Sequence, residues 1–187
     1  MTMRVESSQC FFTSDLHFFH KAMANRRGYV SVEEMNDAII LVWNSRVPVN
    51  ADVFLLGDVS FGGSANTVSV LGQLNGRIHL IAGNHDKGHS KAVRNMFSSI
   101  HDVLEIDVRE APSVLQRIFL SHFSHRVWNM HHYGAWHLYG HSHGSLPGIG
   151  KSMDVGIDTG EFYSYDLIKE RLSSVPIHTV DYHRSLI

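Results

Sequence analysis

The sequence predicts an α/β fold, because short apolar runs alternate with stretches of helical periodicity. Each run ends at glycine or a small polar residue, and its length suits a buried strand. The predicted strands are 10–12, 53–56, 78–82, 117–120 and 136–139, with further strands near 103–108, 153–157 and 177–182. Periodicity alone cannot distinguish one such run from a piece of buried helix, so the prediction depends on the alternation.

One helix is strongly indicated between the first two apolar runs. Ser31 and Glu34 form a capping box, apolar residues then recur at near-helical spacing, and Pro48 ends the pattern. Further helices are expected over 64–74 and, more briefly, over 166–172. Functional loops of such folds gather at the carboxyl ends of strands, so we expect the chemistry there.

The composition describes an ordinary globular chain and excludes several classes of protein. With 187 residues, 43% of them hydrophobic and 18% charged, we expect a single domain spanning 1–187. No apolar run approaches the roughly 20 residues that span a bilayer, and the N-terminal residues lack a signal-peptide core. We therefore expect a cytoplasmic protein with no membrane partner.

Cysteine content and charge narrow the possibilities further. A single cysteine, Cys10, excludes an internal disulfide and a cysteine-rich zinc site. The formal net charge of −2 provides no basic field for a long nucleic acid, which argues against such a partner. A small nucleotide-sized substrate remains compatible with this charge.

The chain has 15 histidines, and several of them lie in polar clusters that directly follow predicted strands. The five clusters are Asp15-Leu16-His17, Gly57-Asp58, Gly83-Asn84-His85-Asp86, Ser121-His122 and Gly140-His141-Ser142-His143-Gly144. Taken singly, each can be an ordinary turn or a solvated loop. Taken together, they offer two carboxylates, one amide, four imidazoles and no thiolate as metal ligands. This donor set suits Mn, Fe, Zn, Ni or Co.

Several of these side chains have chemically distinct capacities. If the chain is extended at Asp15 and His17, their side chains point to the same side and can hold one ion together. The carboxylate of Asp58 can bridge two metals through its two oxygens. Asn84 offers a neutral amide oxygen that leaves a metal strongly Lewis acidic, and the neighbouring His85 can donate a proton.

Together, these motifs resemble those of the calcineurin-like metallophosphoesterase superfamily, and they span residues 13–144. The chain is also similar to a small bacterial and phage branch of phosphoesterases, through Glu34-Met35-Asn36, Trp43-Asn44, Leu74-Asn75-Gly76 and Val155-Gly156-Ile157-Asp158. It departs from that branch at Phe19, often glycine there, and at Phe123-Ser124, where Tyr-Pro is frequent. The resemblance implies a four-layer α/β/β/α sandwich of two mixed sheets flanked by helices.

The resemblance also implies a centre of two divalent ions, with Mn expected and Fe, Zn, Ni or Co as alternatives. One ion is assigned to Asp15, His17 and His143, and the other to Asn84, His122 and His141, while Asp58 bridges them. His85 then faces the substrate as proton donor or charge stabiliser. Two ions held in this way would supply a metal-bridging hydroxide as the nucleophile that attacks phosphorus.

The substrate is less tightly defined by the sequence. His20, Arg26 and Arg27 are candidate contacts, because guanidinium matches phosphate geometry, but surface or packing roles fit them equally well. No arginine lies in the motifs around Asp58 and Asn84, which favours a phosphodiester with a nucleotide-like group over a phosphomonoester. The alternatives are a phosphomonoesterase and a catalytically silent metal-binding scaffold. The oligomeric state stays open.

Overall fold

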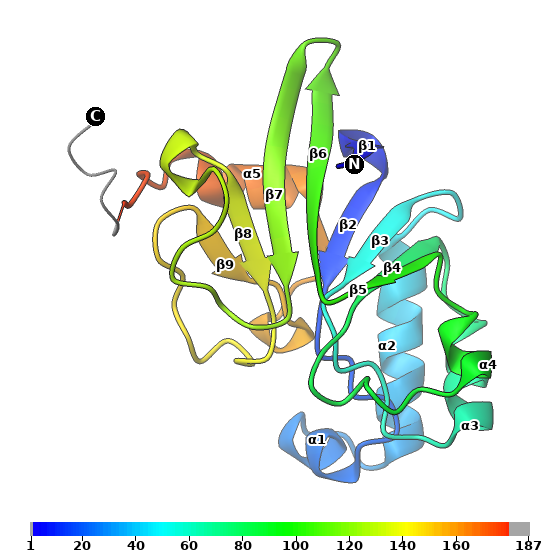
Figure 1. Ribbon diagram of the computed structural model, residues 1–187. Coiled ribbons are helices and arrows are strands. Elements are labelled where there is room, and N and C mark those ends of the chain that lie inside the picture. Colours follow the sequence, from blue (N-terminus) through cyan, green and yellow to red (C-terminus); the bar gives the residue numbers. More distant parts are fainter. Residues whose placement is uncertain (1, 180–187) are drawn as a thin grey trace.

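The computed structural model describes residues 2–179 and contains two five-stranded mixed sheets, which confirms the predicted α/β sandwich (Figure 1). Sheet A has the order β1-β6-β7-β8-β9, with strands Met3–Glu6, Val103–Ala111, Val114–Ser121, Trp136–Tyr139 and Ser152–Asp154. Sheet B has the order β10-β2-β3-β4-β5, with strands Tyr163–Ser164, Cys10–Thr13, Asp52–Leu55, Arg77–Ile81 and Ser99–His101. The pairs β6–β7 and β10–β2 are antiparallel, and the other pairs are parallel.

The helices include the one that the capping box predicts. They are α1 (Lys21–Arg26), α2 (Val32–Arg46), α3 (Ser64–Leu71), α4 (Lys91–Arg94) and α5 (Tyr165–Ser173), with short 3-10 turns η1 (Ser7–Gln9), η2 (His131–Tyr133) and η3 (Ile157–Thr159). At the start of α2, the Glu34 amide donates to Ser31 Oγ at 3.0 Å, and the Glu34 carboxylate accepts from the Val30 amide at 2.7 Å. These bonds satisfy helix-end donors that would otherwise be unpaired.

Two apolar clusters hold the layers together. The first lies between sheet B and helices α1 to α4, and Trp43 of α2 is fully buried in it against Phe162. The second joins the facing surfaces of the two sheets, with Phe12 and Phe54 stacked at 5.5 Å. Helix α5 contributes to this second cluster, where Tyr165 stacks on Trp136. The two sheets therefore share one core, and their strand ends are held in fixed relation.

The structure contains most of the helices and strands that the sequence predicts, and several short elements that it does not predict. The strands expected over 10–12, 53–56, 78–82, 117–120, 136–139 and 103–108 are present, while only Ser152–Asp154 of the 153–157 region is a strand. The helix expected over 64–74 ends at Leu71. Strands β1, β5 and β10 and helices α1 and α4 were not predicted. No strand forms over 177–179, and residues 180–182 of that prediction lie outside the described residues.

The strands that precede the predicted ligands end in one region of the molecule. Strands β2, β3 and β4 run parallel in sheet B, and β7 and β8 run parallel in sheet A. In Figure 1 the arrowheads of β3, β7 and β8 point toward the same loops, next to α1. The polar clusters of both sheets are thereby brought together. Within residues 2–179, no helix is both long and apolar enough to cross a bilayer.

Candidate metal centre

The clusters that follow the strands converge into two groups of metal-ligating side chains. The first group is Asp15, His17 and His143, and the second is Asp58, His122 and His141; the ligand atoms within each group lie within 4.8 Å of one another. Each group takes residues from the loops of both sheets. A hydrogen bond links the two sides, since the His141 amide donates to Asp15 Oδ2 at 2.9 Å.

Asp58 lies between the two groups. Its Oδ2 is 3.8 Å from His17 Nε2 in the first group, and its Oδ1 is 3.6 Å from His122 Nε2 in the second. The side chain is only 3% exposed, so neither oxygen is well solvated. A carboxylate that offers one oxygen to each group has the orientation that a bridging ligand requires.

Asn84 lies beside the second group, where its side-chain oxygen faces His122. The Nδ1 of His122 lies 2.6 Å from the Leu56 carbonyl oxygen, so Nδ1 carries the proton and Nε2 carries the lone pair. That Nε2 lies 3.0 Å from Oδ1 of Asn84. With Nε2 unprotonated, this nitrogen and the amide oxygen lie close enough to bind one cation together.

His143 has the corresponding arrangement in the first group. Its Nδ1 lies 2.5 Å from Oδ2 of Asp158, which leaves Nε2 to face the group. Hydrogen bonding to Asp158 raises the pKa of His143 above its ordinary value, although burial opposes this. A carboxylate behind the outer nitrogen of a ligating histidine fixes the ring and makes it a stronger donor to a metal.

Some buried polar atoms of the first group have no hydrogen-bond partner within residues 2–179. They are Oδ1 of Asp15 and both ring nitrogens of His17. Leaving such groups unsatisfied costs about 1–3 kcal/mol each, and a cation would satisfy them. The donor set, the facing acceptors and these unpartnered atoms fit two divalent ions held by nitrogen and oxygen ligands.

Five of the candidate ligand residues have a left-handed backbone, which is rare for residues other than glycine. The φ angles are 60° at Asp15, 52° at His17, 54° at Asp58, 65° at His141 and 49° at His143. The only other non-glycine residues with positive φ in the described chain are Phe19 and Met130. Such conformations cost about 1–3 kcal/mol each and cluster at functional sites.

Two glycines allow the backbone to pass close to the ligands. A Cβ at Gly83 would lie 2.4 Å from Oδ1 of Asp58, and a Cβ at Gly140 would lie 1.9 Å from Oγ of Ser14. No larger side chain fits at either position without displacing the site. The site therefore requires glycine before Asn84 and before His141.

Asp86 organises the loops around the site, a role that the sequence analysis did not assign to it. Its buried carboxylate accepts from the amides of Asp58 and Gly83, each at 2.8 Å, and from Val59 at 3.0 Å. Because these amides lie in the loops after β3 and β4, one side chain fixes both loops. The only sequence signal was an acid that follows Gly83-Asn84-His85.

Replacing Asp86 by alanine should lower the free energy of unfolding of the metal-free protein by at least about 3 kcal/mol, because three buried amides lose their acceptor. Asp86→Asn keeps one acceptor oxygen and should lose clearly less. Urea denaturation of the metal-free proteins measures both values. A small and equal loss in the two variants would show that the carboxylate does not hold the loops.

His85 lies beside the two groups and belongs to neither. Its Nε2 is 3.9 Å from Oδ2 of Asp58, and its side chain is 45% exposed. The backbone amide of His85 donates to Oδ1 of Asp58 at 3.1 Å, which fixes the residue next to the centre. A solvent-accessible imidazole at this position can reach a substrate.

The three predicted substrate contacts differ in their surroundings. His20 packs edge-on against His17, with ring centroids 5.5 Å apart, and its Nδ1 accepts from the Met23 amide at the start of α1. Arg26 is exposed and has no ion pair within the described residues. Both stay available as predicted contacts.

Arg27 has the packing role that the sequence left open as the alternative to a phosphate contact. Its guanidinium forms two hydrogen bonds to Asp158, at 2.7 and 2.8 Å, and also donates to the carbonyls of Leu16 and Asp15. With the side chain 10% exposed, little of it can reach a substrate phosphate. Burial of Asp158 favours its neutral form, but the hydrogen bonds from Arg27 and His143 outweigh this and hold its pKa well below its usual range. Arg27 thus keeps Asp158 in its charged form, and the carboxylate of Asp158 orients His143.

His137 supports the loop that follows His122. Its Nδ1 donates to the Phe119 carbonyl at 3.2 Å, and its Nε2 accepts from the His125 amide at 2.9 Å, which requires a neutral ring. Burial lowers its pKa from 6.5 to about 4.

The folded protein should therefore lose stability as the pH falls below 6.5, because the unfolded chain then binds a proton that folded His137 does not. Between pH 7 and pH 4 the contribution of this ring amounts to about 3 kcal/mol. His137→Gln keeps a donor and an acceptor without titrating, so its free energy of unfolding should fall less over this range. Equal losses in urea titrations of both proteins at the two pH values would contradict this.

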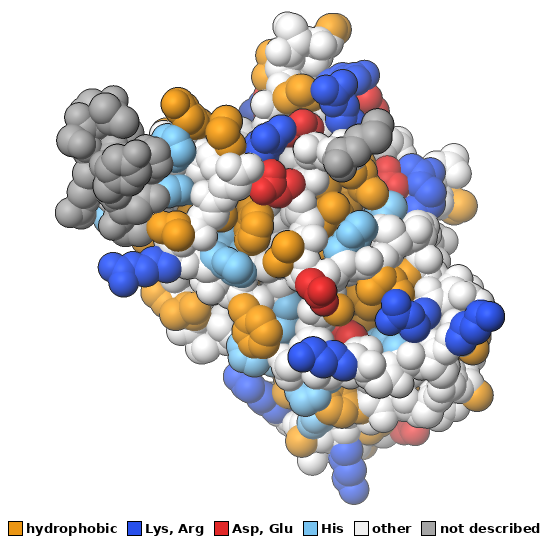
Figure 2. All heavy atoms as spheres, viewed as in Figure 1, with side chains coloured by type: hydrophobic (Ala, Val, Ile, Leu, Met, Phe, Trp, Pro, Cys, Tyr) orange, Lys and Arg blue, Asp and Glu red, His pale blue; other side chains and the backbone are white. Residues whose placement is uncertain are grey.

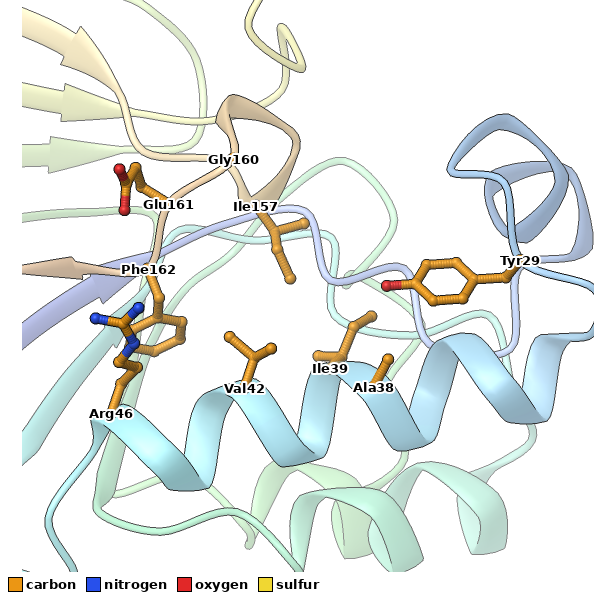
Figure 3. A pocket seen from close by; sticks show the side chains of 9 residues that line it. All are labelled: Tyr29, Ala38, Ile39, Val42, Arg46, Ile157, Gly160, Glu161 and Phe162. Atoms are coloured by element: carbon orange, nitrogen blue, oxygen red, sulfur yellow. The ribbon is translucent and has the colours of Figure 1, made fainter.

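A separate hollow of about 340 Å³ lies between α2 and the η3 segment (Figure 3). Its wall is largely apolar, with Val42 and Ile157 on opposite sides and Arg46 beside Phe162 at one end. None of the predicted site residues lines it. The hollow is therefore distinct from the metal centre.

Comparison with known proteins supports the fold and leaves the chemistry to the geometry of the site. No model of a known protein family matches the chain. The Gene 66 protein of Mycobacterium phage L5 is 29% identical over 207 residues, covering 92% of this chain and 100% of the phage protein. A crystal structure of a protein of unknown function from Aquifex aeolicus superposes with a TM-score of 0.65 at 20% identity, over 87% of this chain and 98% of that one. The Pseudomonas putida nuclease MPE gives a TM-score of 0.42 at 18% identity, over 73% and 63% of the two chains. This chain therefore shares its fold with the Aquifex protein.

Proposed function

We propose that this protein is a metal-dependent phosphoesterase of the calcineurin-like type with two divalent ions, most suited to a small nucleotide-like phosphodiester. The observation that carries the proposal is the position of Asp58. It directs one carboxylate oxygen to each of two histidine-containing groups. Two ions that share a ligand in this way are typical of sites for in-line displacement at phosphorus.

Seven residues are the proposed metal ligands. Asp15, His17, Asp58, Asn84, His122, His141 and His143 would hold the two ions, of which Mn is the expected species. Bound there, the ions supply Lewis acidity to a phosphoryl oxygen and a nucleophile at neutral pH. Leu56 and Asp158 accept from Nδ1 of His122 and of His143, which directs Nε2 of each ring at the centre.

His85 supplies what the ligands cannot. In its protonated form, Nε2 of His85 can give a proton to the leaving ester oxygen, or it can balance the charge that builds on the phosphoryl oxygens. Its position beside Asp58, open to solvent on one side, suits both roles. The leaving-group dependence described in the Discussion distinguishes them.

The ion pair of Arg27 with Asp158 supports a diester substrate. A dianionic monoester needs fixed cations around the phosphate, and Arg27 is committed to Asp158. A diester carries one negative charge, which His85 and two ions can balance. The other arginine among the predicted contacts, Arg26, is exposed and without an ion pair in the described chain.

The test compares kcat/KM for bis(p-nitrophenyl) phosphate and p-nitrophenyl phosphate at matched pH and Mn²⁺. The diester should be the better substrate. A monoester advantage of tenfold, about 1.4 kcal/mol in transition-state binding, would overturn the preference. If Arg26→Ala removed that advantage, Arg26 would be the missing cation. Absence of turnover with either ester by a protein that holds two ions would favour the silent scaffold instead.

A further inference from the structure

Two phenylalanine rings lie open to solvent beside the candidate metal centre. All ten phenylalanines of the chain are described, and only Phe61 and Phe123 are exposed, by 40% and 49%. Leaving such a ring in water forgoes the stabilisation that burial gives. The two rings are therefore candidates for contact with a ligand.

Each ring contacts a different group of the centre. Phe61 stacks on His17 at 5.3 Å between ring centroids, with an interplanar angle of 19°, and lies 4.7 Å from His85. Phe123 packs edge-on against His122 at 5.0 Å and against His141 at 4.6 Å. Asp58 lies within 4 Å of His17 and of His122, so the two rings flank the position of the bridging carboxylate.

A hollow of about 250 Å³ adjoins Phe123, and its wall includes Asn84, Lys87, Asp102 and His125. Lys87 is exposed and forms no ion pair within residues 2–179, so its ammonium can donate to a ligand. Complete sites for small molecules occupy about 300–1,000 Å³, so this hollow suits one ring system of a larger substrate. On the face shown in Figure 2, histidine side chains reach the surface beside apolar and basic ones.

We propose that Phe61 and Phe123 stack the two substituents of a phosphodiester between two nucleosides. The inference rests on the proposed function and assigns a substrate class to the same site. Phe61 contacts His85, which can give a proton to the leaving oxygen, so it stacks the leaving nucleoside, while Phe123 and the adjoining hollow hold the retained one. A monoester would leave one ring unused. Stacking on aromatic side chains also explains how the site can bind a dinucleotide without a basic groove.

The first experiment keeps the leaving group constant. With metal-loaded protein, thymidine 5′-(p-nitrophenyl phosphate) is compared with methyl p-nitrophenyl phosphate, in which a methyl group replaces the retained nucleoside. Phe123→Ala should lower kcat/KM for the nucleoside ester by about 10- to 100-fold, the usual loss of one base–aromatic stack. The same variant should change kcat/KM for the methyl ester little. Phe123→Trp should retain the preference for the nucleoside ester. Tyr133→Ala, which removes another exposed ring, should leave kcat/KM for both esters unchanged.

The second experiment keeps the retained group constant. Dithymidine monophosphate is compared with the 5′-methyl phosphate ester of thymidine, which lacks the leaving nucleoside. Phe61→Ala should selectively slow the dinucleotide, with the metal content unchanged. Binding of dithymidine monophosphate to the metal-free protein, followed by shifts of the phenylalanine ring protons in NMR spectra, tests stacking without catalysis.

The outcomes separate the two proposals. Equal losses for both esters of a pair in either alanine variant would mean that the ring only packs against its histidine, and would overturn the inference. Turnover without any preference for nucleoside esters would overturn it as well. Ring-proton shifts on dinucleotide binding, with no hydrolysis of any ester, would support the stacking surfaces and refute the proposed function.

Discussion

Asp58→Ala should abolish hydrolysis and remove both metal ions together. The reason is that the two carboxylate oxygens of Asp58 face different groups, His17 on one side and His122 on the other. Loss of this side chain deprives both ions of a ligand and leaves two neighbouring cations without the anion between them. Elemental analysis after dialysis should give two ions per chain in the wild type and close to none in the variant, with turnover of bis(p-nitrophenyl) phosphate lost.

Two further variants make this result specific. His143→Ala removes a ligand of the first group only and should lower the metal content by about one ion. Asp37→Ala removes an exposed carboxylate on α2 and should leave metal content and rate unchanged. A fully active wild type that never holds more than one ion per chain would rule out the two-metal mechanism. Normal turnover by Asp58→Ala would be equally damaging.

His85→Ala should keep both ions and slow the reaction by about 10²–10⁴-fold, the usual contribution of a positioned acid or base. The expectation rests on an imidazole that lies 3.9 Å from Asp58 and remains 45% exposed. If His85 protonates the leaving oxygen, the loss should be smaller for p-nitrophenolate, which leaves readily as an anion, than for an alkoxide.

The comparison needs two substrates with the same retained group and different leaving groups, with His178→Ala as a control for an exposed imidazole outside both groups. Equal losses with both leaving groups would restrict His85 to charge stabilisation. A loss of metal along with activity would instead make it a ligand.

The strong elements could be predicted because their signals are local. Ser31, Glu34 and Pro48 mark α2 within one stretch of chain, and continuous apolar runs mark β2, β3, β4, β7 and β8. Strands β1, β5 and β10 have two to four residues each, and neighbouring strands hold them in place. Periodicity cannot reveal elements that depend so largely on tertiary pairing.

The candidate ligands could be predicted because each follows a strand end, and the residues behind them could not. Asp158 lies far along the chain from Arg27, and nothing local relates the two, yet their bidentate ion pair fixes the ring of His143. The charge of the Arg27 guanidinium suits a phosphate, and nothing in the sequence distinguishes that contact from a packing role. The role of Asp86 could not be predicted, because the residue type alone does not reveal that its carboxylate accepts hydrogen bonds from three backbone amides.

The left-handed backbone at five of the ligand positions has a consequence for protein engineering. Glycine tolerates this conformation better than aspartate or histidine does, since it has no Cβ. A redesign that optimised only thermal stability would therefore be drawn to Asp15, His17, Asp58, His141 and His143 as its first substitutions. Such a protein would be more robust and would have lost its metal centre, which is the usual exchange between stability and activity.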